Sequence, residues 1–301
     1  MVKHSLTSFL LSNHLLTDCQ FGFREKRSTV LQLLAFTNLL HRNRTNGLMS
    51  DVLYIDFSKA FDTVSHTKLL QKLSAYGVSG NLHSWISSWL TGRMQCVDVD
   101  GVLSSSTPVL SGVPQGSVLG PLLFLIYIND IVDNIHPSVT PFLFADDLKL
   151  VVSYKGTTNL TNTALHDAIH CLEQWTAKWQ MYVNTSKCAV LYCGLHNPRL
   201  DYNLSGQTLA KVDTVRDLGV LISHDLSFRA HISDVVKRAT KAVNFIFIAI
   251  KSRSPTVLTR AYTVYARPIL EYASPVYDPH LLKEYLHCRQ YLHCRQYLHC
   301  R

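Results

Sequence analysis

The chain has 301 residues, of which 47% are hydrophobic and 17% are charged, and its formal net charge at pH 7 is +8. This apolar share excludes long disorder for most of the chain, because disordered segments combine low hydrophobicity with dense charge. A membrane span is not expected either. The longest apolar run, 118–128, is interrupted by Gly120 and Pro121 and falls well short of the roughly 20 residues that a span needs.

The cysteines and the lack of a secretory signal indicate a reduced, intracellular protein. No C-x2-C pair occurs among the eight cysteines, so a zinc finger is not favoured. No secretory signal follows Lys3, so we expect an intracellular location, nuclear or cytoplasmic, without a clear targeting signal. The tail 281–301 carries a six-residue tandem repeat. Its His and Cys residues could be a metal-binding tail, but perfect repetition favours a low-complexity end.

In the first third of the chain the hydrophobic pattern predicts helices around one strand. Ser28 is a typical N-cap, and the apolar positions of 30–40 have helical spacing. The nearly continuous apolar run 51–57 predicts a strand. Ser65 predicts the start of another helix, and a short helix is expected around 85–90.

Further along, strands and helices continue to alternate. The stretch 141–152 predicts a β-hairpin with an acidic tip, followed by a helix over 165–179. Short strands are expected at 189–192 and 218–222. The last long helix, 231–251, has an apolar stripe and a basic face made by Lys237, Arg238 and Lys241. This order favours an α+β fold.

Three aspartates lie at the ends of predicted strands, where their carboxylates could bind metal ions. Asp56 ends an apolar strand, and Asp146 and Asp147 lie at the predicted hairpin tip. Two divalent metals need several converging carboxylates, and Mg²⁺ prefers oxygen ligands. Successive strand residues face opposite sides, so Asp146 and Asp147 should have different roles. We therefore expect the three side chains to converge within reach of one metal cluster. Each feature alone is also typical of a solvated turn or a helix cap.

The stretch 111–121 is rich in Gly and Pro and leads into an apolar, helix-like run. Its backbone would let a large flat ligand approach closely, with Gln115 as a polar contact; a plain loop before a helix is the alternative. It contains neither a phosphate-binding loop nor a nucleophile elbow.

Taken in order, the blocks YIDFSKAFD at 54–62, SGVPQGSVLGP at 111–121 and FADD at 144–147 resemble the reverse transcriptase domain of non-LTR (LINE-type) retrotransposons. Flanking segments resemble the same family over roughly residues 5–280. They are 20–29, 179–187, 217–220 and 267–272. The resemblance implies a right-hand polymerase palm, an antiparallel sheet backed by helices, with partial fingers and a partial thumb. Its parts would be fingers at 1–50, palm at 51–225 and thumb at 226–280, before the tail at 281–301.

The resemblance also implies the site. Asp56 and Asp146, with the backbone carbonyl of Phe57, would bind two Mg²⁺ ions, for which Mn²⁺ could substitute, and Asp147 would complete the acidic pair. Further roles are implied for substrate and nucleic-acid contacts. Phe61 would select deoxynucleotides, Gln115 and Gly116 would touch the nucleotide or template, and Lys187 would protonate pyrophosphate. Arg24, Lys26 and Arg27 would meet template phosphates, and Lys237, Arg238 and Lys241 would lie along the duplex. The alternatives are a core aromatic for Phe61 and solvated charges for the basic residues.

The implied activity is RNA-directed DNA polymerisation, with an RNA template, a DNA primer and a dNTP as partners. The family's Arg-Pro block is not found before Asp18, and the match ends soon after Tyr272, so a domain truncated at both ends is expected. A catalytically inactive relic that at most binds nucleic acid is the alternative, and an intron maturase or telomerase-like enzyme is a third reading. The sequence leaves the oligomeric state open.

Overall fold

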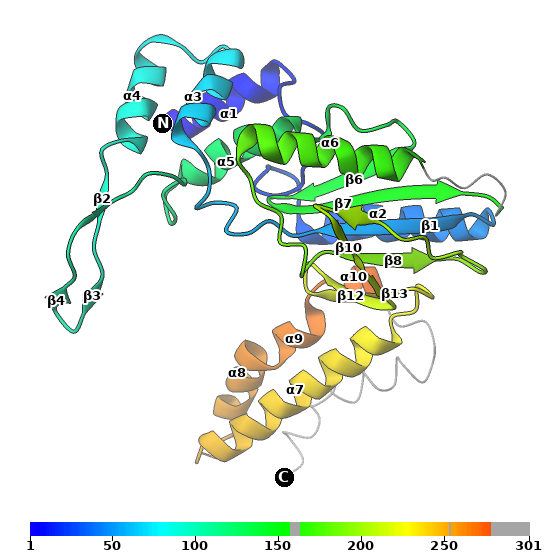
Figure 1. The fold of residues 1–301 in the computed structure, drawn as a ribbon. Coiled ribbons are helices and arrows are strands. Elements are labelled where there is room, and N and C mark those ends of the chain that lie inside the picture. Colours follow the sequence, from blue (N-terminus) through cyan, green and yellow to red (C-terminus); the bar gives the residue numbers. More distant parts are fainter. Residues whose placement is uncertain (157–162, 253, 278–301) are drawn as a thin grey trace.

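A five-stranded sheet organises the molecule in the computed structural model, which describes residues 1–156, 163–252 and 254–277 (Figure 1). The predicted repeat tail at 281–301 lies outside the described residues. The strand order is β11–β8–β1–β7–β6, and every pair is antiparallel except β11 with β8. The strands are β1 Met49–Ile55, β6 Val139–Phe144, β7 Asp147–Tyr154, β8 Ala189–Cys193 and β11 Ala210–Val212. The expected α+β class with an antiparallel-rich sheet is confirmed.

Both faces of the sheet are covered by other elements, and the side chains of β1 are accordingly apolar on both faces. Leu53 and Ile55 face one hydrophobic cluster, and Val52 and Tyr54 face the other. The first cluster contains five helices: α1 Val2–Ser12, α3 His66–Ala75, α4 Gly80–Leu90, α5 Gly120–Ile128 and α6 Thr163–Trp179. The second contains α2 Thr29–Thr45, α10 Ser274–Tyr277 and the hairpin of β12 Thr214–Asp217 and β13 Val220–Ser223.

Two parts extend from this core (Figure 1). A thin ribbon follows α4 and returns to α5, and a helical arm begins after β13. The ribbon strands are β2 Met94–Gln95, β3 Asp98–Val99, β4 Val102–Leu103 and β5 Thr107–Pro108. The arm contains α7 Arg229–Ala249, α8 Pro255–Tyr265 and α9 Arg267–Glu271. The remaining short elements are the 3-10 helix Asn129–Val132, β9 Asn203–Leu204 and β10 Gln207–Thr208. None of the described helices has the length and apolar character needed to cross a membrane.

The predicted N-cap of α2 is confirmed, since the Ser28 hydroxyl accepts from the Leu31 N–H at 3.2 Å. Three predicted boundaries are shifted. The strand expected at 51–57 is Met49–Ile55, and Phe57 forms only an isolated bridge with Val183. The strand expected at 218–222 begins at Val220, because the two residues before it have positive φ and form the turn. The helix expected at 231–251 is Arg229–Ala249.

Candidate active site at the β6–β7 turn

The register of the sheet brings Asp56 to the acidic turn. Ile55 pairs with Leu148 in the β1–β7 ladder, so the next residue, Asp56, leaves β1 beside the start of β7. Phe144 pairs with Asp147 to close the β6–β7 hairpin around Ala145 and Asp146. Ala145 has a φ of 56°, which lets the chain reverse over two residues.

The carboxylates at this end of the sheet influence one another. Burial raises the pKa of Asp146, and the nearby negative charge of Asp56 raises it further. Burial, followed by the charges of Asp146 and Asp217, raises the pKa of Asp147 to about 6. These carboxylates lie near one another and partly out of water, where a cation would relieve their repulsion.

The convergence of the three carboxylates on one metal site stays a prediction. Within the described part of the chain, no three His, Cys, Asp or Glu side chains lie close enough to hold a metal ion by themselves. The reason lies in β7, where Asp147 shares a strand face with Lys149 two residues on. Lys149 is paired with Asp217 across that face.

The oxygen atoms on the side of Asp56 still fit a hard divalent cation. The Ser58 N–H donates to the Tyr182 carbonyl, and the Asp56 carbonyl accepts from the Asn184 N–H, each at 2.8 Å. These two hydrogen bonds are made by the residues before and after Phe57. Neither of them uses the carbonyl oxygen of Phe57. Two carboxylates and a carbonyl suit Mg²⁺, which normally completes its shell with water and substrate phosphates.

Lys187 lies beside Asp56. Its Nζ is 3.7 Å from Oδ1 of Asp56, and its side chain is 66% exposed. An ion pair this open adds little stability. Lys187 can therefore leave Asp56 and pair with another anion at the site at little cost in stability.

The Gly/Pro-rich loop packs against the segment after Asp56. The Phe61 carbonyl accepts from the Val113 N–H at 2.9 Å, and Gln115 Nε2 donates to Oδ1 of Asp62 at 2.6 Å. A Cβ on Gly112 would lie 2.9 Å from the Asp62 backbone, and Gly112 has a φ of +90°, so only glycine fits there. Gln115 is thus engaged with Asp62, while a Cβ on Gly116 would meet nothing within 4 Å.

A hollow of about 670 Å³ opens beside this loop. Its lining includes Lys59, Asp62, Arg93 and Gln115. Lys59 and Arg93 were not predicted as site residues. Lys59 lies inside the recognised block 54–62, whereas Arg93 lies between blocks, where the sequence carries no signal.

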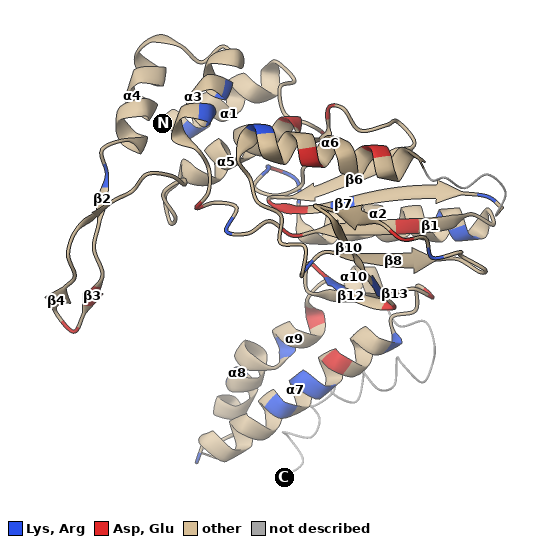
Figure 2. Cartoon of the chain, viewed as in Figure 1, with Lys and Arg blue, Asp and Glu red and all other residues tan. Residues whose placement is uncertain are grey.

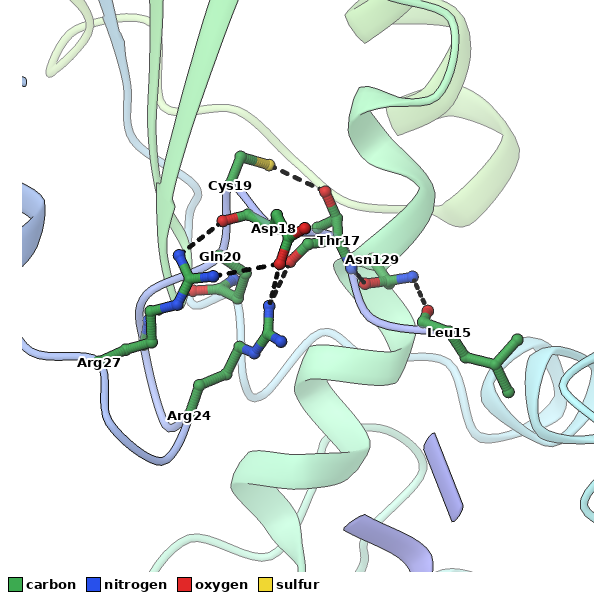
Figure 3. A network of polar contacts seen from close by, with 9 residues as sticks. Leu15, Thr17, Asp18, Cys19, Gln20, Arg24, Arg27 and Asn129 are labelled. Atoms are coloured by element: carbon green, nitrogen blue, oxygen red, sulfur yellow. Dashed lines mark hydrogen bonds and ion pairs between the residues drawn. The ribbon is translucent and has the colours of Figure 1, made fainter. Parts of the chain in front are cut away.

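The basic loop 24–27 is largely occupied by contacts within the loop region (Figure 3). Arg24 is 12% exposed, donates to the Thr17 carbonyl at 2.6 Å and is paired with Asp18. Arg27 donates to the Asp18 carboxylate and to its carbonyl. A template contact by Arg24 stays a prediction, and it would require this mostly buried side chain to leave Thr17 and Asp18. Lys26 is exposed.

The predicted basic face of the long helix is present. Lys237, Arg238 and Lys241 are exposed on α7, which extends away from the sheet (Figure 2). Arg238 is partly neutralised, since its Nε lies 3.0 Å from Oδ2 of Asp234.

Gln20 is a site residue that the sequence did not single out. It is buried, and its Oε1 accepts from the N–H groups of Ala145 and Gly22 at 2.8 and 2.7 Å. Its Nε2 donates to the Ala145 carbonyl at 3.2 Å. Gln20 opens the recognised segment 20–29, but its partner is 125 residues away, which only the fold reveals.

Comparisons with known proteins indicate one family. A family model described as reverse transcriptase (RNA-dependent DNA polymerase) matches residues 1–222. The RNA-directed DNA polymerase from mobile element jockey of Drosophila funebris is 30% identical over 86% of this chain and 29% of its own length. The probable RNA-directed DNA polymerase from transposon X-element of Drosophila melanogaster is 27% identical over 88% of this chain and 29% of its own length. The chain thus spans less than a third of these relatives.

The fold has parallels among solved structures. Apo telomerase from Candida tropicalis has a TM-score of 0.59 at 12% identity, covering 99% of this chain and 51% of that one. Telomerase from Candida albicans, solved with a fragment of telomeric RNA, has a TM-score of 0.53 at 12% identity, covering 99% and 55%. At such low identity these likenesses show the fold alone, and they confirm the palm-like α+β architecture.

Proposed function

Because the chain belongs to the reverse transcriptase (RNA-dependent DNA polymerase) family, we propose that it is the RNA-directed DNA polymerase of a non-LTR retrotransposon. The 3′-hydroxyl of a DNA primer attacks the α-phosphate of a dNTP on an RNA template, and pyrophosphate leaves. The observation that carries the proposal is the pairing of Ile55 with Leu148, which sets Asp56 beside the turn with Asp146 and Asp147.

The cofactor that suits these oxygen donors is a divalent metal. Two Mg²⁺ ions, or Mn²⁺ in their place, bound by Asp56, Asp146 and the Phe57 carbonyl, would neutralise the triphosphate and favour ionisation of the primer hydroxyl. Asp147, on the neighbouring strand position, adds negative potential at the edge of the site.

The remaining groups position the substrate. Lys187, with its ammonium near Asp56, holds the proton that leaving pyrophosphate takes up. The Phe61 ring limits the space at the sugar and so selects deoxynucleotides. Gln115 and Gly116 line the path of the nucleotide or template, beside the hollow that contains Lys59 and Arg93. Most of the rate acceleration then comes from orientation and charge neutralisation.

We assign the parts of the polymerase from the family resemblance. Residues 1–50 form partial fingers, 51–225 the palm and 226–280 a partial thumb. Lys26, Arg27, Lys237, Arg238 and Lys241 are the cations proposed to meet the RNA template and the DNA primer. Of these, Lys26 is exposed in the loop before α2, and Lys237, Arg238 and Lys241 are exposed on the helical arm.

Primer extension tests this function. The parent chain and Asp146→Asn are each incubated with an RNA template, a DNA primer, dNTPs and Mg²⁺ or Mn²⁺, and Asp98→Asn in the distant ribbon serves as the matched control. We expect extension by the parent and by Asp98→Asn, and a loss of at least roughly a thousandfold in Asp146→Asn. No extension by a folded parent that still binds template–primer would favour the non-catalytic alternative.

A further inference from the structure

Phe23 is an aromatic residue in an unusual setting. Its side chain is 56% exposed, and its φ is 54°, in the left-handed region that non-glycine residues rarely occupy. The ring borders a cavity of about 160 Å³, with Leu122 and Leu125 of α5 among the other lining residues. Packing in a core does not explain this strained backbone, and strain of this kind concentrates at functional sites.

The position of Phe23 is tied to the catalytic turn. The Phe21 N–H donates to the Leu143 carbonyl at 2.7 Å, so this segment runs along β6. A Cβ on Gly22 would lie 2.3 Å from the backbone nitrogen of Ala145, which shows how closely the two backbones approach. On the other side of Phe23, Arg24 is fixed by Asp18 and the Thr17 carbonyl (Figure 3). Phe23 therefore lies between two anchored neighbours, Gly22 against the turn at Ala145 and Arg24 against Asp18.

The ring of Phe23 contacts Phe61, the residue proposed to select the sugar. The two ring centroids are 6.0 Å apart, and the planes meet at 79°, an edge-to-face pair. Phe61 also stacks on Phe124 of α5, with centroids 4.1 Å apart and planes 18° apart. Phe124 is fully buried in the core, where close packing restricts its ring. Phe61 thus has a rigid partner on one side and Phe23 on the other.

We propose that Phe23 is a positioning residue for Phe61: the Phe23 ring fixes the orientation of the Phe61 ring and thereby sharpens the selection of deoxynucleotides over ribonucleotides. This inference rests on the proposed polymerase function. Without Phe23, Phe61 would keep its stack on Phe124 but could tilt on its free side. The tilt would open room for a 2′-hydroxyl.

Single-nucleotide incorporation measures the effect. kcat and KM are determined for a dNTP and the matching rNTP on one primer–template, for the parent, Phe23→Ala, Phe23→Leu and Phe23→Tyr. An aromatic pair of this kind predicts a roughly two- to tenfold fall in the dNTP/rNTP ratio of kcat/KM for Phe23→Ala and Phe23→Leu. The fall should come from better rNTP use, and Phe23→Tyr should restore the parent ratio.

A double-mutant cycle separates positioning from a direct contact. Phe61→Ala should lower the ratio more than Phe23→Ala, and Phe23→Ala/Phe61→Ala should match Phe61→Ala alone, because Phe23 acts only through Phe61. Trp85→Ala, which removes an exposed aromatic ring on α4, should leave the ratio unchanged. An unchanged ratio in Phe23→Ala, or additive effects in the double variant, would overturn the inference while the polymerase function stands. Failure of the parent to extend any primer would instead remove the proposed function.

Discussion

Gly22 shows at the scale of one residue how the segment before α2 contacts the candidate active site. The absent side chain lets the backbone lie against Ala145, and Gln20 then bonds both the N–H and the carbonyl of Ala145. Contacts from residues 20–22, which lie outside the β6–β7 hairpin, therefore help to fix the turn that carries Asp146.

Gly22→Ala should lower both stability and activity. The new Cβ would lie 2.3 Å from the Ala145 nitrogen, so one backbone must move and the Gln20 bonds must lengthen. Overpacking of this kind costs about 1–3 kcal/mol of unfolding free energy. Urea unfolding and primer extension provide the measurements. Gly47→Ala is the control for activity: its Cβ meets nothing within 4 Å, and its φ of +69° makes the alanine strained only locally, so it should lose some stability but keep full activity. Equal activity in the two variants would contradict the importance of the close approach.

At this scale the sequence predicted some of the site but not all of it. Asp56, Asp146 and Lys187 could be proposed as site residues because they lie inside recognisable blocks. The burial of Arg24 and the clamp by Gln20 could not, because both depend on partners brought close only by folding. Asp147 could be predicted only in part. Strand alternation indicated that its role differs from that of Asp146, but it did not indicate that Asp147 lies near the buried Lys149.

At the scale of elements, a buried ion pair joins strand β7 to the β12–β13 hairpin before the helical arm. Lys149 of β7 lies 2.8 Å from both carboxylate oxygens of Asp217 in β12 and 3.1 Å from Oε1 of Gln32 in α2. Both charged side chains are almost fully buried. Three elements far apart in the sequence are thereby held together under Asp147.

Lys149→Met should destabilise the fold strongly, because it leaves the buried Asp217 without its partner. We expect a loss of about 3–5 kcal/mol in unfolding free energy. Lys149→Met/Asp217→Leu should recover at least about half of that loss, since it removes both charges. Lys211→Met, at an exposed pair with Asp201, is the control and should cost less than about 1 kcal/mol. A double variant less stable than Lys149→Met would contradict this account.

A second element-scale feature is His231, where α7 leaves the sheet. Nδ1 of its buried ring accepts from the Leu221 N–H at 3.3 Å, and its Nε2 has no hydrogen-bond partner among the residues that the structure describes. Burial, together with the nearby charges of Arg238 and Arg216, lowers the pKa of His231 to about 4, against the opposing charge of Asp234.

This pKa predicts acid sensitivity. The unfolded chain takes up a proton on this histidine near pH 6.5, whereas the folded chain does so only near pH 4. The stabilisation is therefore present above pH 6.5 and is lost as the pH falls towards 4, by up to about 3 kcal/mol. Urea unfolding between pH 7.5 and 4.5 should show a smaller slope in His231→Gln than in the parent. Parallel curves would show that His231 titrates normally.

On the scale of the whole molecule, the net charge of +8 is distributed unevenly. Basic residues of α7 are exposed on the arm that extends from the sheet (Figure 2), whereas none of the residues between Arg93 and Lys149 is Lys or Arg. Lys237→Ala/Lys241→Ala should weaken template–primer binding and reduce the slope of log K against log salt by about 1–2. Arg42→Ala on α2 is the control and should leave the slope unchanged. An unchanged slope in the arm variant would show that the duplex does not follow α7.

The architecture as a whole was more predictable than its contacts. The hairpin of β6 and β7 and the helix α6 follow directly from hydrophobic periodicity, and the α+β class follows from their order. The strand order β11–β8–β1–β7–β6 could not be derived in this way. It depends on pairings between segments about 100 residues or more apart, such as Ile55 with Leu148.

The measurement that tests the central claim most directly is the single-turnover rate of RNA-templated primer extension in Asp56→Asn, Asp146→Asn and the double variant. Because the two carboxylates are proposed to act as one unit, each single variant should lose at least roughly a thousandfold in rate, and the double variant should lose little more. Retention of most of the parent rate in either single variant, or losses that multiply in the double variant, would contradict a shared site at the β6–β7 turn.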